Sequence, residues 1–423
     1  MAELVGNLLV AQSGGPTSVI NASVAGVIQE AGKHGLIEEI YAGLNGIYGI
    51  LNEDLIDLNE EKARAIEGLK HTPGAALGTC RYKIDFKKKP EQAAKDMDRL
   101  FEVFQAHNIR YFFYVGGNDS QDTSNQIHQE AVKRNYEMRI IGVPKTIDND
   151  LPHTDHTPGF GSAAKYVATT VAEVAIDVGG MATDEGSCCI IEIMGRTAGW
   201  LAASSILARR NGSQAPHIIL LPELPFDEAK FLAKVKETVD ANKFCVVVVG
   251  EGIKNSAGEE LGADKSRLDA FGHPVLSGAA DRLAEIVQSK LNTKTRTVKL
   301  GYAQRAAAHL ASQRDIDEAV MCGEAAVRAA VEGRSGFRVK LVRSSNDPYH
   351  CATDLQDLAD IANAVHEIPR DWISDDGFLP NEKFVEYCRP LIEGEPKLIF
   401  EAGLPKYVTL DRVLVDKTLG ARA

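Results

Sequence analysis

The stretch LLVAQSGGPTSVINASVAGVIQEAG, residues 8–32, decides the fold, because an apolar run passes through a glycine turn into a helix-compatible segment. In that segment Val19, Ile20 and Val24 begin a series of apolar residues at helical spacing, which predicts a helix. Thr17 or Ser18 offers an N-cap for this helix. Strand, glycine turn and helix in this order form the unit from which parallel α/β sheets are built.

The same order of a strand-like run followed by a glycine-rich or polar turn recurs at five further places along the chain. The short runs YFFYV, RIIGV, CCIIEI, FCVVVV and RTVKL, each with β-branched or aliphatic residues, are followed by GGNDS, PKTIDND, MGR, GEG and GYAQR, respectively. Ligands of open parallel sheets bind beyond the carboxyl ends of the strands, so we expect the six turns to converge on one cleft. Because a chain of 423 residues exceeds what one hydrophobic core usually organises, we predict an α/β protein with two lobes.

Helical patterns lie between these strands and again near the end of the chain. Residues 160–180 carry an apolar face and a Gly-Gly stop, and residues 197–212 and 227–243 are predicted as two further helices. In the segment LQDLADIANAVHEIP, one helical face that stops before Pro369 carries Leu355, Leu358, Ile361, Ala362 and Val365. The C-terminal region is therefore predicted to consist of docked helices.

Composition and charge exclude several classes of partner. A formal net charge of −12 argues against nucleic acid and anionic membranes, both of which require a basic surface. No apolar run approaches membrane-spanning length, and the N-terminus lacks the basic region of a secretory signal. The seven cysteines include no CxxC pair, which indicates reduced thiols in a cytoplasmic protein and does not indicate a zinc site. Anionic small substrates stay possible at a focused site.

Two glycine turns and one arginine could bind phosphate. Gly14-Gly15 and Gly116-Gly117 precede helices, where backbone N–H groups and the helix N-terminus favour an anion. A tight turn with a positive backbone angle explains these glycines equally well. Arg81, in LGTCRYK, offers a guanidinium fork to phosphate, although a surface arginine beside Lys83 has the same appearance.

The densest group of reactive side chains is PKTIDND, residues 144–150, directly after an apolar run. Asp148 could accept a proton from a substrate hydroxyl, and Asp150 could hold a divalent metal directly or through water. Lys145 could neutralise charge on a transferring phosphoryl group. A structural Asp/Asn turn is the alternative, but acids and a lysine at one strand end favour a function.

Taken in order, the motifs SGGP, LGTCR, GGNDS, PKTIDND, IIEIMGR, GEG and GYAQR resemble those of the phosphofructokinases, with coverage from about Gly14 to Arg305. The later segments SSNDPY and DWISDDGFL resemble those of the longer bacterial members, in particular the pyrophosphate-using branch. The resemblance implies two similar Rossmann-like α/β lobes of mostly parallel sheet, with the active site in the cleft between them. It also implies transfer of a phosphoryl group to the 1-hydroxyl of fructose 6-phosphate, giving fructose 1,6-bisphosphate.

The resemblance further implies how the chain is divided. Residues 1–150, joined by parts of 275–423, are expected to form the donor-binding lobe, and residues 151–305 the lobe that binds the sugar phosphate. Residues 340–423 are expected to form a helical C-terminal extension packed on the lobes. The partners expected are fructose 6-phosphate and pyrophosphate, with a homodimer or homotetramer as the assembly.

Individual roles follow from the positions that match the family's motifs. Asp148 is implied as the base, with Thr146 and Ile147 beside it. The sugar would be held by Met194, Gly195, Arg196 and Glu251, its 6-phosphate by Tyr302 and Arg305, and a neighbouring subunit would contribute Arg296. The phosphoryl donor would be held by Gly14, Gly15, Arg81, Asn118, Asp119, Ser120 and Lys145.

Two residues bear on the choice of donor. In ATP-using members the positions of Asp119 and Lys145 are typically glycine. A carboxylate fills space and repels the inner phosphate of a nucleotide, whereas the lysine offers charge to a donor without adenosine. Both changes predict pyrophosphate, with an ATP-dependent 6-phosphofructokinase as the alternative. Asp119 could instead be the N-cap of the helix that follows it.

Two departures from the family pattern concern the metal and the assembly. Asn118 replaces an aspartate that many members use near Mg²⁺, so Asp150 and the pyrophosphate oxygens are expected to carry more of the metal. Ser187 replaces a second intersubunit arginine, which leaves the shared site and its allosteric control open. A noncatalytic sugar-phosphate-binding protein is a further alternative, but Asp148 and Arg196 are both retained. The absence of GxGxxG after the first strand argues against a dinucleotide-dependent oxidoreductase.

Overall fold

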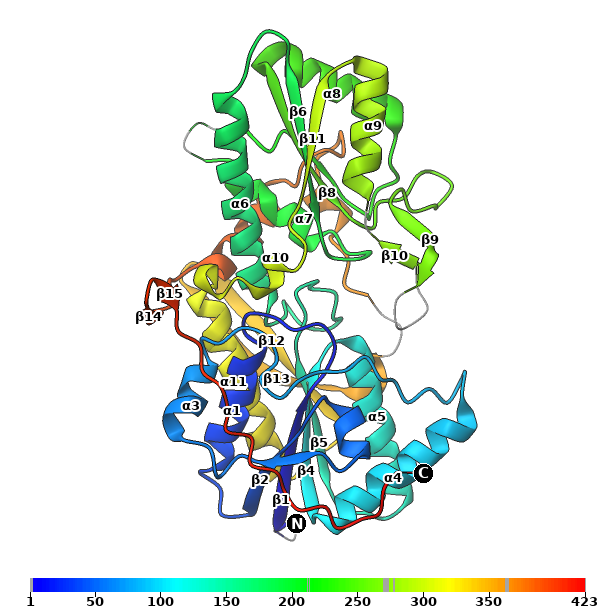
Figure 1. The fold of residues 1–423 in the computed structure, drawn as a ribbon, viewed down its shortest axis with the longest axis vertical. Coiled ribbons are helices and arrows are strands. Elements are labelled where there is room, and N and C mark those ends of the chain that lie inside the picture. The colour runs from blue at the N-terminus through cyan, green and yellow to red at the C-terminus, as the bar shows by residue number, and fades with distance from the viewer. Residues whose placement is uncertain are drawn as a thin grey trace.

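The computed structural model describes residues 3–210, 212, 214–268, 274–276, 278–361 and 365–422. Two α/β lobes are stacked along the long axis of the molecule, with the N-terminal strands in one lobe and the segment from α6 to α9 in the other (Figure 1). The α/β class with mostly parallel sheets predicted from the sequence is confirmed.

The first lobe is built on a sheet of seven strands in the order β13-β12-β5-β4-β1-β2-β3. The central pairs are parallel, whereas β3 and β13 run antiparallel at the two edges. The strands are β1 (Gly6–Gln12), β2 (Ile37–Gly43), β3 (Leu55–Asp57), β4 (Ile109–Gly116), β5 (Arg139–Pro144), β12 (Phe337–Asn346) and β13 (Tyr349–Asp357).

Helices cover both faces of this sheet, because its strands are apolar on both sides. Leu8 and Val10 of β1 pack in one core with three helices, and Leu9 and Ala11 pack in a second core with three others. The first three are α1 (Ile20–Ala31), α3 (Ala63–Leu69) and α11 (Gln313–Val331), and the others are α2 (Ile47–Leu51), α4 (Pro90–Ala106) and α5 (Asn118–Lys133).

The strand order reverses between β1 and β4, and the helices that follow these two strands lie on opposite faces. Such a switch point opens a crevice at the carboxyl ends of the strands. The turns SGG and GGNDS both end there. The reversal of strand order therefore predicts a ligand-binding site in the first lobe, between the N-terminal ends of α1 and α5.

Two glycines allow α1 and α11 to approach closely. A Cβ atom on Gly26 would lie 2.3 Å from the carbonyl oxygen of Val320, and one on Gly323 would lie 2.1 Å from that of Ser23. No real Cβ fits at such distances, so the contact requires glycine on both helices.

The second lobe has a sheet of four strands in the order β11-β6-β8-β7, and every pair is parallel. The strands are β6 (Ser187–Ile193), β7 (Ile218–Leu220), β8 (Phe244–Gly250) and β11 (Lys294–Lys299). One face packs on α6 (Phe160–Gly180), α7 (Trp200–Ser204) and the 3₁₀-helix η1 (Ser205–Ala208), and the other on α8 (Glu228–Asn242) and α9 (Ala279–Leu291). Between residues 263 and 310 the chain also forms β9 (Ala263–Leu268), β10 (Pro274–Leu276), α10 (Ala303–Ala306) and η2 (Ala308–Leu310).

The six strands predicted before glycine or polar turns are all present, as are the helices at 160–180 and 227–243. The predicted N-cap of the first helix is wrong. This helix begins at Ile20, and its N-cap residue is Val19, which makes no side-chain cap. Thr17 instead accepts a hydrogen bond from the Val19 N–H at 3.2 Å, because the glycine turn continues for several residues before the helix starts. The helix predicted at 197–212 is short and passes into η1.

The prediction of docked helices at the C-terminus is wrong in its main part. Leu355 lies in β13, which pairs with β12 over its whole length, so sheet pairing overrides the helical spacing of the sequence. Leu358 and Ile361 are buried as predicted, but on the short 3₁₀-helix η3 (Leu358–Ile361), and Val365 is exposed. Ala362, which also belonged to the predicted face, lies outside the described residues.

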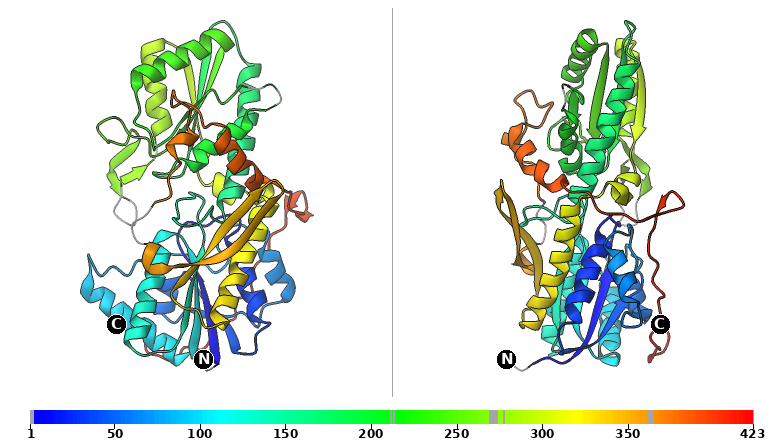
Figure 2. Two further views of the ribbon diagram at one scale, coloured as in Figure 1. Left: turned by 180° about the vertical axis from the view of Figure 1, so that it is seen from behind. Right: turned by 90° about the vertical axis from the view of Figure 1, so that its left-hand side faces the viewer.

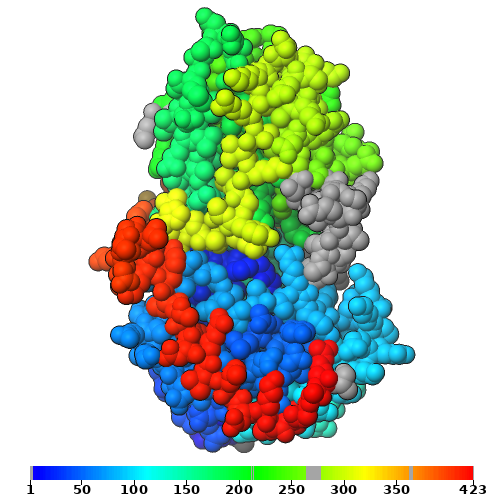
Figure 3. Space-filling view, viewed as in Figure 1, coloured from blue at the N-terminus to red at the C-terminus, as the bar shows by residue number. Residues whose placement is uncertain are grey.

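The rest of the C-terminal region alternates short helices with extended chain. Its elements are η4 (Arg370–Trp372), α12 (Glu382–Cys388), η5 (Arg389–Ile392), β14 (Phe400–Glu401) and β15 (Leu404–Pro405). The β12–β13 hairpin and α12 lie on the side of the molecule that faces away from the viewer in Figure 1 and toward the viewer in the left view of Figure 2. After β15 the chain runs over the surface of the first lobe (Figure 3), where Asp57 N–H donates to Val413 O and Val415 N–H donates to Leu55 O.

Two sequence-based expectations about the whole chain concern membranes and cysteines. In the part of the chain that the structure describes, no helix combines the length and the apolar character needed to cross a bilayer. All seven cysteines are free thiols, and five of them are buried.

Candidate active site

A cavity of about 450 Å³ lies between the lobes and is lined by the turns at the strand ends. The predicted convergence of these turns is therefore confirmed. Sixteen of the candidate residues line the cavity: Gly14, Gly15, Arg81, Asn118, Asp119, Ser120, Lys145, Thr146, Ile147, Asp148, Asp150, Met194, Gly195, Arg196, Glu251 and Arg305.

On the side of the first lobe, the two glycine turns and Lys145 meet. Gly14 has φ of 75°, so its backbone does require glycine. The ammonium group of Lys145 donates to the carbonyl oxygen of Gly15 at 2.7 Å. Lys145 is buried, and burial lowers its pKa to about 8, although the charges of Asp148 and Asp150 favour the protonated form. A positive charge is thus fixed at a turn that can receive phosphate.

The two acids of the PKTIDND turn lie beside this lysine. Burial raises the pKa of Asp148 to about 7, and the charges of Asp150 and Glu251 act in the same direction. Burial also raises the pKa of Asp150. The N–H of Asp148 donates to Thr146 Oγ1 at 3.1 Å, which fixes the backbone of the turn. A carboxylate with a pKa near neutrality can take up and release a proton at physiological pH.

Asn118 and Asp150 form the part of the site that suits a divalent metal. Asn118 Nδ2 donates to Asp150 Oδ2 at 3.1 Å, and Asn118 Oδ1 is buried without a hydrogen-bond partner. Within the described ranges no group of three or more His, Cys, Asp or Glu residues could hold a metal. Mg²⁺ is commonly held by one or two protein oxygens together with substrate phosphates, so this sparse donor set fits a metal that arrives with a phosphate ligand.

Asp119 lies in the first turn of α5, but it is not the N-cap of this helix. The N-cap residue is Gly117, so the capping alternative is wrong. The carboxylate of Asp119 instead accepts a hydrogen bond from Lys83 Nζ at 2.7 Å. Sequence reasoning missed Lys83. Its signal was its place two residues after Arg81 in LGTCRYK.

On the side of the second lobe, two buried side chains shape the turn after β6. Glu251 Oε1 accepts hydrogen bonds from the N–H groups of Gly195 at 3.3 Å and Arg196 at 3.0 Å. Gln304 Oε1 accepts from the N–H of Met194 at 3.3 Å. Sequence reasoning missed Gln304, which lies inside the GYAQR motif and is buried.

Arg305 reaches across the cleft to the first lobe. A Cβ atom on Gly15 would lie 2.8 Å from Arg305 Nη1, so glycine at this position leaves space for the guanidinium. Tyr302 does not line the cavity. It is 70% exposed and its ring packs 4.1 Å from the Arg305 guanidinium carbon. Arg296 is exposed on the edge strand β11 and also lies outside the cavity.

Comparisons with known proteins identify the family of this chain. The family model described as phosphofructokinase matches residues 7–330. The chain is 46% identical over 417 residues to a protein of Xanthomonas campestris pv. campestris named pyrophosphate–fructose 6-phosphate 1-phosphotransferase, covering 98% of this chain and 99% of that protein. A protein of the same name from Halomonas elongata is 45% identical over 414 residues, with 98% of both chains covered.

A solved structure gives the same result for the fold. The crystal structure of the pyrophosphate-dependent phosphofructokinase from Nitrosospira multiformis matches with a TM-score of 0.90 and 42% sequence identity, covering 98% of this chain and 99% of that one. By its family model, its near full-length relatives and the strand-end turns that meet in its cleft, the chain belongs to the phosphofructokinase family.

Proposed function

We propose that this chain is a pyrophosphate-dependent 6-phosphofructokinase. It transfers a phosphoryl group from pyrophosphate to the 1-hydroxyl of fructose 6-phosphate, giving fructose 1,6-bisphosphate and phosphate. The observation that carries the proposal is the buried Lys145 ammonium group 2.7 Å from Gly15 O, beside the donor turns of the first lobe. The names of the near full-length relatives support it.

Asp148 acts as the general base of the forward reaction. It removes the proton of the 1-hydroxyl while the new O–P bond forms and the bridging P–O bond of pyrophosphate breaks. Phosphate leaves with the electron pair of that bond. The raised pKa of Asp148, about 7, suits a group that takes the proton forward and returns it in reverse.

Charge neutralisation falls to Lys145 and Arg81, which line the donor side of the cavity. Phosphoryl transfer depends mainly on positioning and on countering charge at the oxygens of the transferred group. Asn118 and Asp150 would hold Mg²⁺ together with the pyrophosphate oxygens. The metal, when bound, supplies further positive charge to those oxygens.

The second lobe binds the acceptor in this proposal. Arg305, with Tyr302 packed against it, binds the 6-phosphate. Met194, Gly195 and Arg196 hold the sugar on a turn shaped by Glu251. Arg296 is exposed on an edge strand, which suits a residue that serves the site of a neighbouring copy. We therefore propose a homodimer or homotetramer.

Product analysis tests the function. Phosphorus NMR of the purified protein with Mg²⁺, fructose 6-phosphate and pyrophosphate should show the pyrophosphate signal replaced by phosphate and fructose 1,6-bisphosphate in equal amounts. Phosphate without the bisphosphate would indicate a pyrophosphatase and contradict the proposal. Turnover with ATP but not with pyrophosphate would identify the ATP-dependent alternative.

A further inference from the structure

The turn that carries Asp148 and Asp150 (residues 144–150) contacts residues that lie outside the stretch matched by the family model. That stretch ends at residue 330. The Asn149 side chain accepts a hydrogen bond at 3.0 Å from the N–H of Thr157, which lies inside the stretch, and its other contact comes from α12, outside it. Asn149 lies between Asp148 and Asp150, is buried, and has φ of 56°. Its Nδ2 donates to Tyr387 Oη at 2.9 Å. The two acids face the cavity, and the amide between them points into the C-terminal region.

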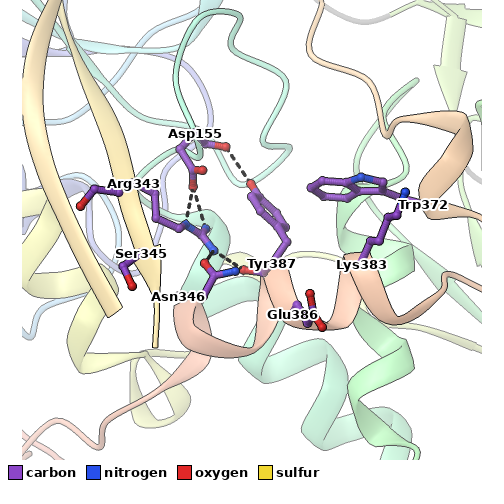
Figure 4. Close-up of a pocket in the computed structure, with 9 residues that line it drawn as sticks. Asp155, Arg343, Ser345, Asn346, Trp372, Lys383, Glu386 and Tyr387 are labelled. Carbon is purple, nitrogen blue, oxygen red and sulfur yellow. Dashed lines mark hydrogen bonds and ion pairs between the residues drawn. The ribbon is translucent and has the colours of Figure 1, made fainter. Parts of the chain in front are cut away.

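Tyr387 is itself fixed in place by two groups (Figure 4). Its hydroxyl donates to the carbonyl oxygen of Asp155 at 2.8 Å, and its own carbonyl accepts from Arg343 Nη1 at 2.7 Å. The guanidinium of Arg343 pairs with the Asp155 carboxylate at 2.6 Å. This arrangement closes a ring of contacts between β12, α12 and the segment that follows the catalytic turn.

A second contact holds the same turn through its backbone. His366 Nδ1 lies 3.0 Å from the carbonyl oxygen of Asn149, and the N–H of His366 donates to the carbonyl oxygen of Asp150 at 3.0 Å. The ring of Trp200 stacks on His366 with centroids 4.5 Å apart, and its Nε1 donates to His366 O at 2.7 Å. The turn is therefore fixed from the C-terminal region at consecutive residues.

Such fixation matters because an asparagine in the left-handed region can adopt other backbone angles, and any change would rotate the neighbouring acids. A displacement of about 1 Å at a reacting group costs on the order of 100-fold in rate. We propose that Asn149 and Tyr387 are positioning residues, which hold Asp148 and Asp150 in the geometry for phosphoryl transfer. In this proposal the C-terminal region contributes to catalysis by fixing the position of the turn that carries the two acids. The inference rests on the proposed role of Asp148.

The test replaces one hydroxyl group and compares two matched variants. Tyr387→Phe removes only the hydroxyl that bonds Asn149. Tyr349→Phe removes a hydroxyl from the same region that donates to Glu318 at 2.5 Å and does not contact the turn. We expect Tyr387→Phe to lower kcat about tenfold with KM for both substrates within about twofold, and Tyr349→Phe to leave both constants unchanged.

Two further measurements separate positioning from general loss of stability. Hydrogen exchange of the peptide spanning 144–151 should quicken in Tyr387→Phe and not in Tyr349→Phe. Asn149→Gly keeps the backbone angle and removes the amide. Adding Tyr387→Phe to it should therefore lower kcat by a smaller factor than in the wild-type background, where the hydroxyl bonds Asn149 as well as Asp155 O.

The inference is overturned if Tyr387→Phe keeps kcat and the exchange rate of this peptide, if Tyr349→Phe causes the same loss, or if the double variant shows additive losses. If the wild-type protein uses ATP and not pyrophosphate, the donor proposal fails, but the same comparison is made with ATP. The exchange measurement needs no substrate, so it tests the inference even in a protein without turnover.

Discussion

Lys83 Nζ lies 2.7 Å from Asp119 Oδ1, so the two side chains form an ion pair. Asp119 is the carboxylate that stands on the donor side of the cleft where ATP-using members typically have glycine. An unpaired carboxylate at this place would repel pyrophosphate as well as a nucleotide, because both bring negative charge. Pairing with Lys83 removes most of that repulsion and leaves the bulk of two side chains where a glycine would leave space. We therefore propose that the choice of donor depends on Lys83 as well as on Asp119 and Lys145.

Removal of the Lys83 charge should weaken pyrophosphate binding. We expect Lys83→Ala to raise KM for pyrophosphate about three- to tenfold, with kcat within about twofold, because the pair is partly exposed and its effect is screened. Steady-state kinetics at low salt measure it, with Lys87→Ala as the control on the same segment. In an Asp119→Asn background the effect should disappear. A full effect in that background would show that Lys83 does not act through Asp119.

The two donor residues can be tested together. We expect Asp119→Gly with Lys145→Gly to lower kcat/KM for pyrophosphate about 100-fold, because a fixed charge at the transferring group is lost. Lys145→Met, which keeps volume and removes charge, should account for most of the loss. Unchanged kcat/KM for pyrophosphate would remove both residues from the donor argument.

The general base should control kcat. We expect Asp148→Asn to lower kcat about 1,000-fold, with little change in KM for fructose 6-phosphate, because the amide cannot take the proton of the 1-hydroxyl. Glu30→Gln, at a buried acid outside the cavity, serves as the control variant. Turnover of Asp148→Asn within tenfold of wild type would contradict the assigned role.

A buried imidazolium should make stability fall at alkaline pH. His156 Nδ1 lies 2.7 Å from Asp155 and Nε2 lies 2.6 Å from Glu318, and these acids are in turn paired with Arg343 and bonded to Tyr349. Burial alone would lower the pKa of His156, but Glu318 and Asp155 together raise it to about 9. The folded protein therefore holds the proton more tightly than the unfolded chain.

The resulting stabilisation is fully present below the ordinary histidine pKa of 6.5 and is lost as pH rises through about 9. We expect the contribution of His156 to the free energy of unfolding to fall by roughly 3 kcal/mol between pH 6 and pH 10. Urea denaturation of wild type and His156→Gln measures it as a difference. Parallel pH curves for the two proteins would contradict the prediction.

Local patterns in the sequence were sufficient to predict the six strands and most of the candidate residues that line the cleft. The turns after β1, β4, β5, β6, β8 and β11 each follow a strand of the two mostly parallel sheets, so topology alone predicts that they meet. The segment around Leu355 was mispredicted because its apolar spacing suits a helix, whereas pairing with β12 comes from residues that no local pattern reveals.

Contacts between distant parts of the chain explain what the sequence left hidden. Lys83 and Asp119 are 36 residues apart, and Asn149 and Tyr387 are 238 apart. Neither Lys83 nor Tyr387 belongs to a motif of its own, and each gains its proposed role only from the residue that the fold brings beside it. The turn residues could be predicted from the sequence, but the pairing of Asp119 with Lys83 and of Asn149 with Tyr387 could not.

The most direct test of the donor assignment is the ratio of kcat/KM for pyrophosphate to kcat/KM for ATP, measured on one preparation with saturating fructose 6-phosphate and Mg²⁺. The proposed function predicts a ratio above about 1,000, because the Lys83–Asp119 pair excludes a nucleotide while Lys145 engages pyrophosphate. A ratio below one would contradict it and identify the protein as an ATP-dependent phosphofructokinase.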